Sequence, residues 1–136
     1  MNVVYAMTRN YYHKILPSVR SLIEHNPDAK IYILAEDDIV PDLPCEATII
    51  NVSRQEYFLP DNCVNYNNQF KYINLLKVVL PSLLPKLQKV IWLDIDTIIC
   101  QELTELWKTD VHGLWFAAVP EFRGKYKPFG DLYYNL

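Results

Sequence analysis

Short apolar runs alternate with stretches of helical periodicity from the beginning of the chain. Residues 3–7 and 31–35 are apolar runs rich in residues that favour strands, and a weaker run of this kind covers 48–52. Between the first two runs, apolar residues recur at helical spacing over 15–23 until an Asn-Pro-Asp sequence interrupts them. This pattern predicts a strand, a helix and two further strands.

The second half of the chain continues the alternation after a polar loop over 53–65. Apolar positions between Phe70 and Leu80 fit one side of a second helix, which Pro81 is expected to end. The apolar run 90–93 predicts a fourth strand and is the clearest strand signal in the sequence. Three weaker elements complete the prediction: a helical turn over 103–107, a strand over 114–119 and the opening of another strand at 132–136.

Strands that alternate with helices indicate an α/β fold with a mostly parallel sheet covered on both faces. In such sheets, ligands bind beyond the carboxyl ends of the strands. The chain has 136 residues and no visible repeat or low-complexity tract, so we expect a single domain over residues 1–136.

Composition narrows the classes of function. A net charge of -3 gives no basic surface of the kind that binds nucleic acid. Cys45, Cys63 and Cys100 are too irregularly spaced for a zinc site or a disulfide framework, which favours a reducing, cytoplasmic compartment. Charged residues and prolines break the apolar segment 75–87, so we expect no transmembrane segment. Any contact with the inner face of a membrane would be peripheral and would use residues outside this sequence.

Two aspartates follow the fourth predicted strand directly. In an extended chain, alternate side chains share a side, so Asp94 and Asp96 would face one cleft while Ile95 points into the protein. Two carboxylates this close repel each other unless a cation lies near them. Mn²⁺ or Mg²⁺, which prefer oxygen ligands, would meet that need and would neutralise a diphosphate leaving group. The ordinary alternative, two solvated acids at a strand end, is disfavoured by the apolar run that precedes them.

The loop after the first predicted strand occupies an equivalent position. The small side chain of Ala6 permits close approach of a flat ring, Thr8 and Asn10 can hydrogen-bond a base or ribose, and Tyr11 can stack on it. Lys77, on the second predicted helix, can reach a phosphate. Taken alone, the loop is better explained as an ordinary polar loop in which Asn10 caps a helix, and Lys77 as a lysine that extends to water.

Together these segments resemble glycosyltransferase family 8, whose retaining enzymes have the Rossmann-like GT-A fold. The resemblance covers essentially the whole chain and is closest to bacterial galactosyl- and glucosyltransferases of lipopolysaccharide synthesis. It is carried by an ordered series of segments: Ala6-Met7-Thr8-Arg9-Asn10-Tyr11, Ser18-Val19-Arg20-Ser21-Leu22, Lys77, Leu80-Pro81-Ser82-Leu83-Leu84-Pro85, Lys89-Val90-Ile91-Trp92-Leu93-Asp94-Ile95-Asp96, Leu103-Thr104-Glu105-Leu106-Trp107 and Tyr133-Tyr134-Asn135.

The resemblance implies a hexosyltransferase with a UDP-sugar donor, a saccharide or glycolipid acceptor, and Mn²⁺ or alternatively Mg²⁺ bound by Asp94 and Asp96. It assigns no catalytic residue in this sequence. It implies that Glu121 and Asn135 contact the donor sugar. The other implied contacts with the nucleotide-sugar are Ala6, Thr8, Asn10, Tyr11, Lys77, Asp94 and Ile95.

Two departures from the family pattern bear on these expectations. Thr8 stands where the family usually has an aspartate that contacts the uridine. The sequence ends at Leu136, before the position of the family's third metal ligand, a histidine, and before its acceptor pocket. We therefore expect a GT-A sheet that is truncated at the C-terminus, with weak or no transfer by this chain alone.

Two other interpretations stay open on the sequence. Phosphohydrolases of the haloacid dehalogenase type also run a strand into a DxD motif, and Asp94 would then be the nucleophile. Their motif usually opens the fold, and a Thr or Val usually stands two residues after the second aspartate, where this chain has Ile98. The other interpretation is a catalytically silent module that binds nucleotide without turnover.

Overall fold

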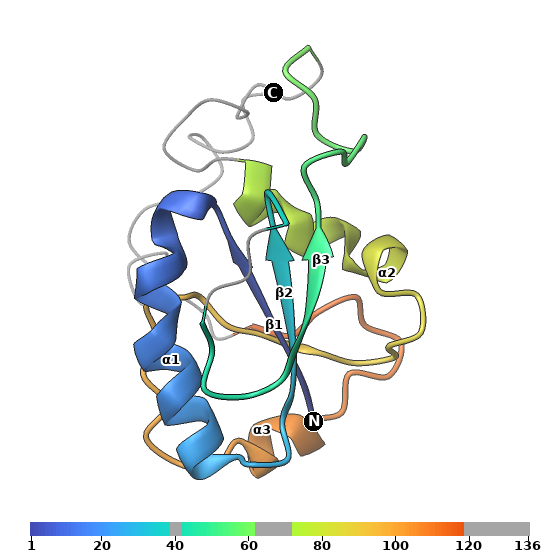
Figure 1. Ribbon diagram of the computed structural model, residues 1–136. Coiled ribbons are helices and arrows are strands. Elements are labelled where there is room, and N and C mark those ends of the chain that lie inside the picture. The colour runs from blue at the N-terminus through green and yellow to red at the C-terminus, as the bar shows by residue number, and fades with distance from the viewer. Residues whose placement is uncertain (39–41, 62–71, 119–136) are drawn as a thin grey trace, which may run out of the picture.

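Four parallel strands form the sheet in the computed structural model, which describes residues 1–38, 42–61 and 72–118 (Figure 1). The strands lie in the order β3-β2-β1-β4. Their bounds are β1 Asn2–Met7, β2 Lys30–Ala35, β3 Ala47–Asn51 and β4 Ile91–Trp92. The parallel α/β sheet is therefore confirmed, and the first three strands lie within one residue of their predicted bounds.

The strand β1 is central because it pairs on both sides. Val3 is level with Ile31 of β2 and with Ile91 of β4, and β2 in turn sets Ile31 level with Ala47 of β3. After β1 the chain moves outward through β2 to β3 and then returns to the other side of β1 as β4. The strand order thus reverses between β1 and β4, and open α/β sheets bind their ligands at such a reversal.

The helix α1, Tyr12–His25, covers one face of the sheet. Its buried residues Ile15, Val19 and Leu22 recur at helical spacing and pack against one set of alternate β1 side chains, Val3, Tyr5 and Met7. Asn26 follows as the C-cap residue, so the predicted end of this helix is confirmed.

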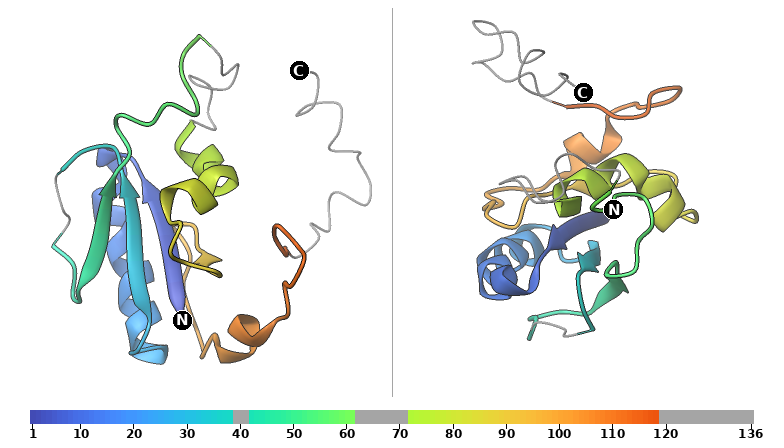
Figure 2. Two further views of the ribbon diagram at one scale, coloured as in Figure 1. Left: turned by 90° about the vertical axis from the view of Figure 1, so that its right-hand side faces the viewer. Right: turned by 90° about the horizontal axis from the view of Figure 1, so that it is seen from above.

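The opposite face of the sheet is covered by η2, Tyr72–Val79, and α2, Leu80–Leu83 (Figure 2). The structure corrects our prediction of a single helix ended by Pro81. A 3₁₀-helix runs to Val79, and a single α-helical turn then begins at Leu80 with Pro81 in its first positions. The first turn of a helix tolerates proline, because its N–H groups have no intrahelical partner. Proline therefore starts an element here instead of ending one.

The segment after β4 is largely irregular. Of the predicted strand 90–93, only Ile91–Trp92 is assigned, although the Leu93 N–H still donates to the Val4 carbonyl at 3.0 Å. The predicted helical turn over 103–107 is found as α3, Thr104–Lys108. No helix in the part of the chain that the structure describes is long and apolar enough to cross a membrane.

The predicted strand over 114–119 is wrong over its described part, 114–118, where no strand is assigned. Gly113 turns the chain just before it at a φ of 73°, and the apolar run that follows faces outward, with Trp115 93% exposed and Phe116 79% exposed. An apolar run forms a strand only if another strand pairs with it, and within the described ranges none does. The remaining position, Val119, and the predicted strand at 132–136 lie outside the described residues.

Candidate functional site

Two chain segments leave the sheet side by side at the reversal of strand order. Thr8 follows β1 immediately, and Asp94 lies two residues beyond the end of β4. Val4 is level with Trp92 in the sheet, and β1 and β4 are parallel, so the segments that follow them leave the sheet in the same direction. The structure thus brings the loop after β1 and the aspartate motif to one edge, which we call the carboxyl edge.

The aspartate motif lies in a turn. The Thr97 N–H donates to the Asp94 carbonyl at 3.2 Å, so the chain is not extended over Asp94–Asp96 as we predicted. Asp94 and Asp96 are nevertheless both exposed, while Ile95 is half-buried and packs against the core beneath α1. The alternation of exposed acids and an inward apolar side chain is found, but it is produced by a turn.

A chain of three hydroxyls, two of them buried, holds this turn. Thr97 Oγ1 donates to the Asp94 carbonyl at 2.7 Å, and Ser18 Oγ lies 3.1 Å from Thr97 Oγ1 and 3.0 Å from the Tyr5 hydroxyl. Each hydroxyl has one proton. Since Thr97 gives its proton to a carbonyl, Ser18 must donate to Thr97 and Tyr5 to Ser18. Burial raises the pKa of the Tyr5 phenol, which keeps it protonated for this role.

Small polar side chains on α1 continue this attachment further along the chain. Ser21 Oγ accepts from the Ile99 N–H at 3.0 Å, and Asn26 Oδ1 accepts from the Leu103 N–H at 2.8 Å. Residues 97–103 therefore run along α1 without forming a strand. Sequence reasoning missed these contacts. The only signal was that Ser18 and Ser21 recur at helical spacing among the apolar positions of this helix.

Lys77 and Trp92 meet above the other face of the sheet. The Lys77 ammonium lies 5.9 Å from the centroid of the Trp92 ring, and Trp92 Nε1 donates to Asp94 Oδ1 at 3.2 Å. Lys77 is exposed and forms no ion pair with any of the described residues. The structure therefore places Lys77 near the aspartate motif through an aromatic ring, a connection that the sequence did not indicate.

The loop after β1 contains a buried polar atom without a partner. Thr8 is only 4% exposed, and its Oγ1 has no hydrogen-bond partner among the described residues. The next residues form the short 3₁₀-helix η1, Arg9–Tyr11, in which Asn10 is exposed and Tyr11 is 42% exposed. A buried hydroxyl without a partner costs about 1–3 kcal/mol. Such an atom fits a site that receives a polar ligand group.

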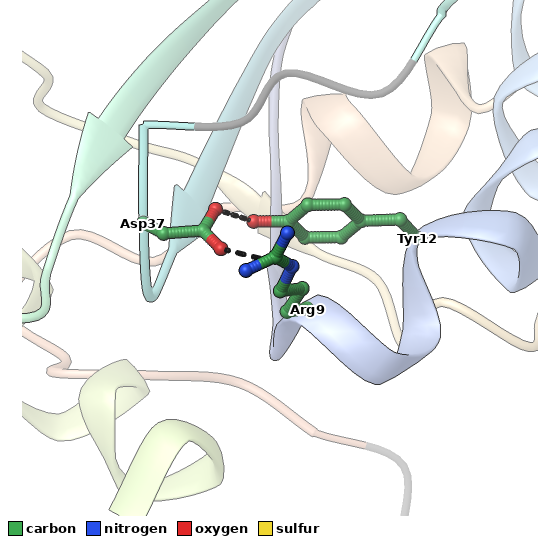
Figure 3. A network of polar contacts seen from close by, with 3 residues as sticks. All are labelled: Arg9, Tyr12 and Asp37. Carbon is green, nitrogen blue, oxygen red and sulfur yellow. Dashed lines mark hydrogen bonds and ion pairs between the residues drawn. The ribbon is translucent and has the colours of Figure 1, made fainter.

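Three polar side chains tie this loop to the end of β2 (Figure 3). The Tyr12 hydroxyl donates to Asp37 Oδ1, and Arg9 Nε lies 3.8 Å from Asp37 Oδ2. Burial raises the pKa of the Tyr12 phenol, and the hydrogen bond to the Asp37 carboxylate raises it further. Asp37 is the middle of three consecutive acidic residues, 36–38, and nothing in the sequence distinguishes it from its two neighbours, so this contact was not predicted.

The donor set at the carboxyl edge suits a hard divalent cation, because its two carboxylates are exposed and supply oxygen ligands. Within the described ranges, no group of three or more His, Cys, Asp or Glu side chains is arranged to hold a metal ion. A cation here would therefore take its remaining ligands from a bound molecule, from water or from residues that are not described. Glu121 and Asn135, two of the predicted sugar contacts, lie outside the described residues.

Comparison with known proteins assigns the family. The model of the family "Glycosyl transferase family 8" matches residues 2–131. Among curated proteins, probable galacturonosyltransferase 13 of Arabidopsis thaliana is 43% identical over 58 residues, which are 40% of this chain and 11% of that protein. The chain therefore spans only a small part of this relative.

Solved structures agree with this assignment at the level of the fold. The structure of the galactosyltransferase LgtC in complex with donor and acceptor sugar analogues superposes with a TM-score of 0.57 at 19% identity, over 82% of this chain and 43% of that one. The glycosyltransferase GlyE of Streptococcus pneumoniae superposes with a TM-score of 0.51 at 21% identity, over 81% of this chain and 27% of that one. The predicted GT-A fold is thereby confirmed.

Proposed function

The chain belongs to glycosyl transferase family 8, and from that premise we propose that the protein transfers a hexose from a UDP-sugar to an acceptor hydroxyl with the help of Mn²⁺. The observation that carries the proposal is the meeting of two different half-sites at the carboxyl edge. An exposed carboxylate pair follows β4, and the loop after β1 has a buried hydroxyl with no hydrogen-bond partner in the described ranges. A nucleoside diphosphate would fit both half-sites, with its diphosphate at the carboxylate pair through the metal ion and its nucleoside at the loop after β1.

The metal half consists of Asp94 and Asp96. Both would bind Mn²⁺, or alternatively Mg²⁺, through carboxylate oxygens, and the bound ion would neutralise charge on the diphosphate leaving group. The turn that holds Asp94 is fixed by Thr97 and Ser18 through direct hydrogen bonds. Lys77 adds a cation that is free to meet a phosphate, since it forms no ion pair within the described part of the chain.

The nucleoside half is the loop from Ala6 to Tyr11. The Thr8 hydroxyl would hydrogen-bond the uracil or ribose, and this bond would satisfy a buried atom that has no partner within residues 1–38, 42–61 and 72–118. Asn10 is exposed and offers an amide to the same group. Tyr11 is also exposed, and its ring, which has the Lys14 ammonium 4.6 Å from its centroid, would stack on the base with its other face. Ala6 leaves room for the base to approach the backbone.

The remaining assignments follow from the family. Ile95 would contact the nucleotide-sugar, Glu121 and Asn135 would contact its sugar, and the acceptor would be a saccharide or a glycolipid. LgtC was solved with donor and acceptor sugar analogues, which supports the same division into two substrates here. We further propose a cytoplasmic protein that meets a glycolipid acceptor at the inner face of a membrane. The family match does not favour the phosphohydrolase alternative.

Calorimetry with Mn²⁺ and UDP tests the metal half. The protein should bind UDP in the presence of Mn²⁺, and Asp96→Ala should abolish the part of the binding that depends on the metal. Asp28→Ala is the matched control, because Asp28 is an exposed aspartate just before β2, at the opposite edge of the sheet. Equal binding by the wild type and Asp96→Ala would refute the proposal.

Turnover separates the enzyme from the silent module. Incubation with Mn²⁺ and radiolabelled UDP-glucose or UDP-galactose should be followed for both hydrolysis and transfer. We expect transfer of the hexose to an acceptor hydroxyl with retention at the anomeric carbon. A protein that binds UDP and Mn²⁺ but transfers no sugar would indicate the silent module.

A further inference from the structure

Trp92 occupies a special position, because it contacts a proposed metal ligand and a proposed phosphate-binding cation at once. We propose that Trp92 is a positioning residue that orients the Asp94 carboxylate for the metal ion and holds the Lys77 ammonium near it. This inference rests on the proposed function. Trp92 itself is not among the site residues that the sequence predicted, although Asp94 and Lys77, which it contacts, are.

The first part of the proposal concerns one oxygen of Asp94. Trp92 Nε1 donates to Asp94 Oδ1 at 3.2 Å, at the long end of the range for an N–H···O hydrogen bond. An indole N–H can only donate, so it keeps a carboxylate oxygen turned toward it and leaves Oδ2 for a cation. Residues that orient metal ligands in this way typically change metal affinity by about 10- to 100-fold.

Trp92 is itself held firmly enough to act on Asp94. It belongs to the last assigned residues of the sheet, level with Val4 of β1. Its ring packs with the buried core of the opposite face from α1, which includes Val4, Tyr72 and Leu76. The orientation of Asp94 is thus set from two directions, since Trp92 holds its side chain and Thr97 holds its carbonyl.

The second part of the proposal concerns Lys77. Its ammonium lies 5.9 Å from the centroid of the Trp92 ring, within the range of a cation–π interaction. Lys77 comes from η2, the element that covers this face of the sheet. The ring therefore keeps the Lys77 ammonium close to Asp94 without an ion pair between them, so the Asp94 carboxylate does not neutralise the charge of Lys77.

A second lysine–tryptophan pair provides a matched control. The Lys89 ammonium lies 5.0 Å from the centroid of the Trp107 ring, on α3, and the same ammonium donates to the Thr109 carbonyl at 3.1 Å. This pair has the same chemistry, but Trp107 donates no hydrogen bond to either aspartate of the motif in the described structure. Changes specific to Trp92 are therefore not general effects of removing an indole beneath a lysine.

The contact itself can be tested without metal or nucleotide. The indole N–H resonance of Trp92, identified by its loss in Trp92→Phe, should shift in Asp94→Ala and stay in place in Asp96→Ala. The indole resonance of Trp107 should move in neither variant. An unchanged Trp92 resonance in Asp94→Ala would overturn the proposal, because the indole would then have no acceptor to lose.

The consequence is tested by the affinity for Mn²⁺ at saturating UDP, measured from the electron paramagnetic resonance signal of free Mn²⁺. Trp92→Phe should weaken Mn²⁺ binding about tenfold, while UDP binding without metal stays at the wild-type level. Trp92→Leu also removes the aromatic face, so it should additionally weaken UDP binding. Trp107→Phe should behave as the wild type. If Trp92→Phe does not fold, benzothienylalanine at this position keeps the ring shape and removes only the N–H.

The outcomes distinguish this inference from the function on which it rests. Equal Mn²⁺ affinities of the wild type and Trp92→Phe, together with a defect in Asp96→Ala, would overturn the role of Trp92 and leave the metal site standing. Wild-type Mn²⁺ affinity in Asp96→Ala would overturn both proposals.

Discussion

The two segments that meet at the carboxyl edge are held in different ways. The turn after β4 is attached to the core through Thr97, Ser18 and Tyr5, and the last two are fully buried. The loop after β1 leaves the Thr8 hydroxyl buried without a hydrogen-bond partner among the described residues, and is attached to the neighbouring loop through the more accessible Arg9 and Asp37. The protein thus fixes the turn that carries the proposed metal ligands with its own side chains, and leaves the proposed nucleoside half for a ligand to complete.

The largest expected effect is on stability, and it is expected for substitution of Ser18, which holds the turn after β4. Ser18→Ala removes the middle of the hydroxyl chain and leaves the Tyr5 phenol buried without an acceptor. The free energy of unfolding should fall by about 2 kcal/mol, measured by urea denaturation. Ser53→Ala, at an exposed serine after β3, should change it very little. A loss no larger than that of the control would show that the turn after β4 is held by other contacts.

A smaller effect on binding is expected at Tyr11. Tyr11→Ala should reduce the affinity for UDP by about 1 kcal/mol if the ring stacks on the base. Stability should hardly change, because the ring is already 42% exposed. Tyr57→Ala is the matched control, since Tyr57 is 44% exposed and lies beyond β3. If UDP affinity were the same in both variants, the base would have to bind elsewhere.

Substitution of Thr8 tests the loop after β1 more closely, because the stability of the unliganded protein should rise while the affinity for UDP falls. Thr8→Val keeps the shape of the side chain and removes the unpartnered hydroxyl, so the unliganded protein should be stabilised by up to about 1 kcal/mol. The affinity for UDP should fall at the same time. Thermal denaturation with and without UDP measures both quantities. A destabilised unliganded variant would mean that the Thr8 hydroxyl already has a partner.

The smallest expected effect is on the unfolding free energy at alkaline pH, through Tyr12, which attaches the loop after β1. Burial raises the pKa of Tyr12 above its ordinary value of 10.0. The phenol in the folded state thus keeps its proton where the unfolded state loses it, and the unfolding free energy should fall as pH rises above 10.0. Tyr12→Phe should flatten this decline. Tyr5, whose pKa is also raised, should account for a further part that Tyr5→Phe removes.

Local patterns were enough to predict the part of the fold around β1. Strands β1, β2 and β3 and helix α1 are each specified by their own apolar spacing, so their positions could be predicted without knowledge of their neighbours. The segment 114–118 failed for the opposite reason, because its apolar run does not reveal whether another strand pairs with it. The prediction of one helix ended by Pro81 was wrong, because apolar spacing alone does not distinguish a single α-helix from a 3₁₀-helix followed by a short α-helix.

The candidate site was predictable only where its residues are close in sequence. Asp94 and Asp96 were singled out because they directly follow an apolar run, and Thr8 to Tyr11 because they follow another. The residues that hold these groups come from elsewhere. Ser18 and Thr97 are 79 residues apart, and nothing in the spacing of either predicts that they touch. Trp92 lies within the motif, yet its hydrogen bond to Asp94 depends on side-chain orientation.

The central position of β1 also has a consequence for the order in which the protein forms. The Asn2 side chain donates to the carbonyl of Lys89, 87 residues away, and β1 cannot acquire its second neighbour until that part of the chain exists. During synthesis on the ribosome, β1 can pair with β2 early, while its other edge keeps unpaired backbone groups. Such an edge readily pairs with other chains. The nascent protein should therefore be most prone to aggregation, and most in need of a chaperone, in the interval between the release of β2 and that of β4.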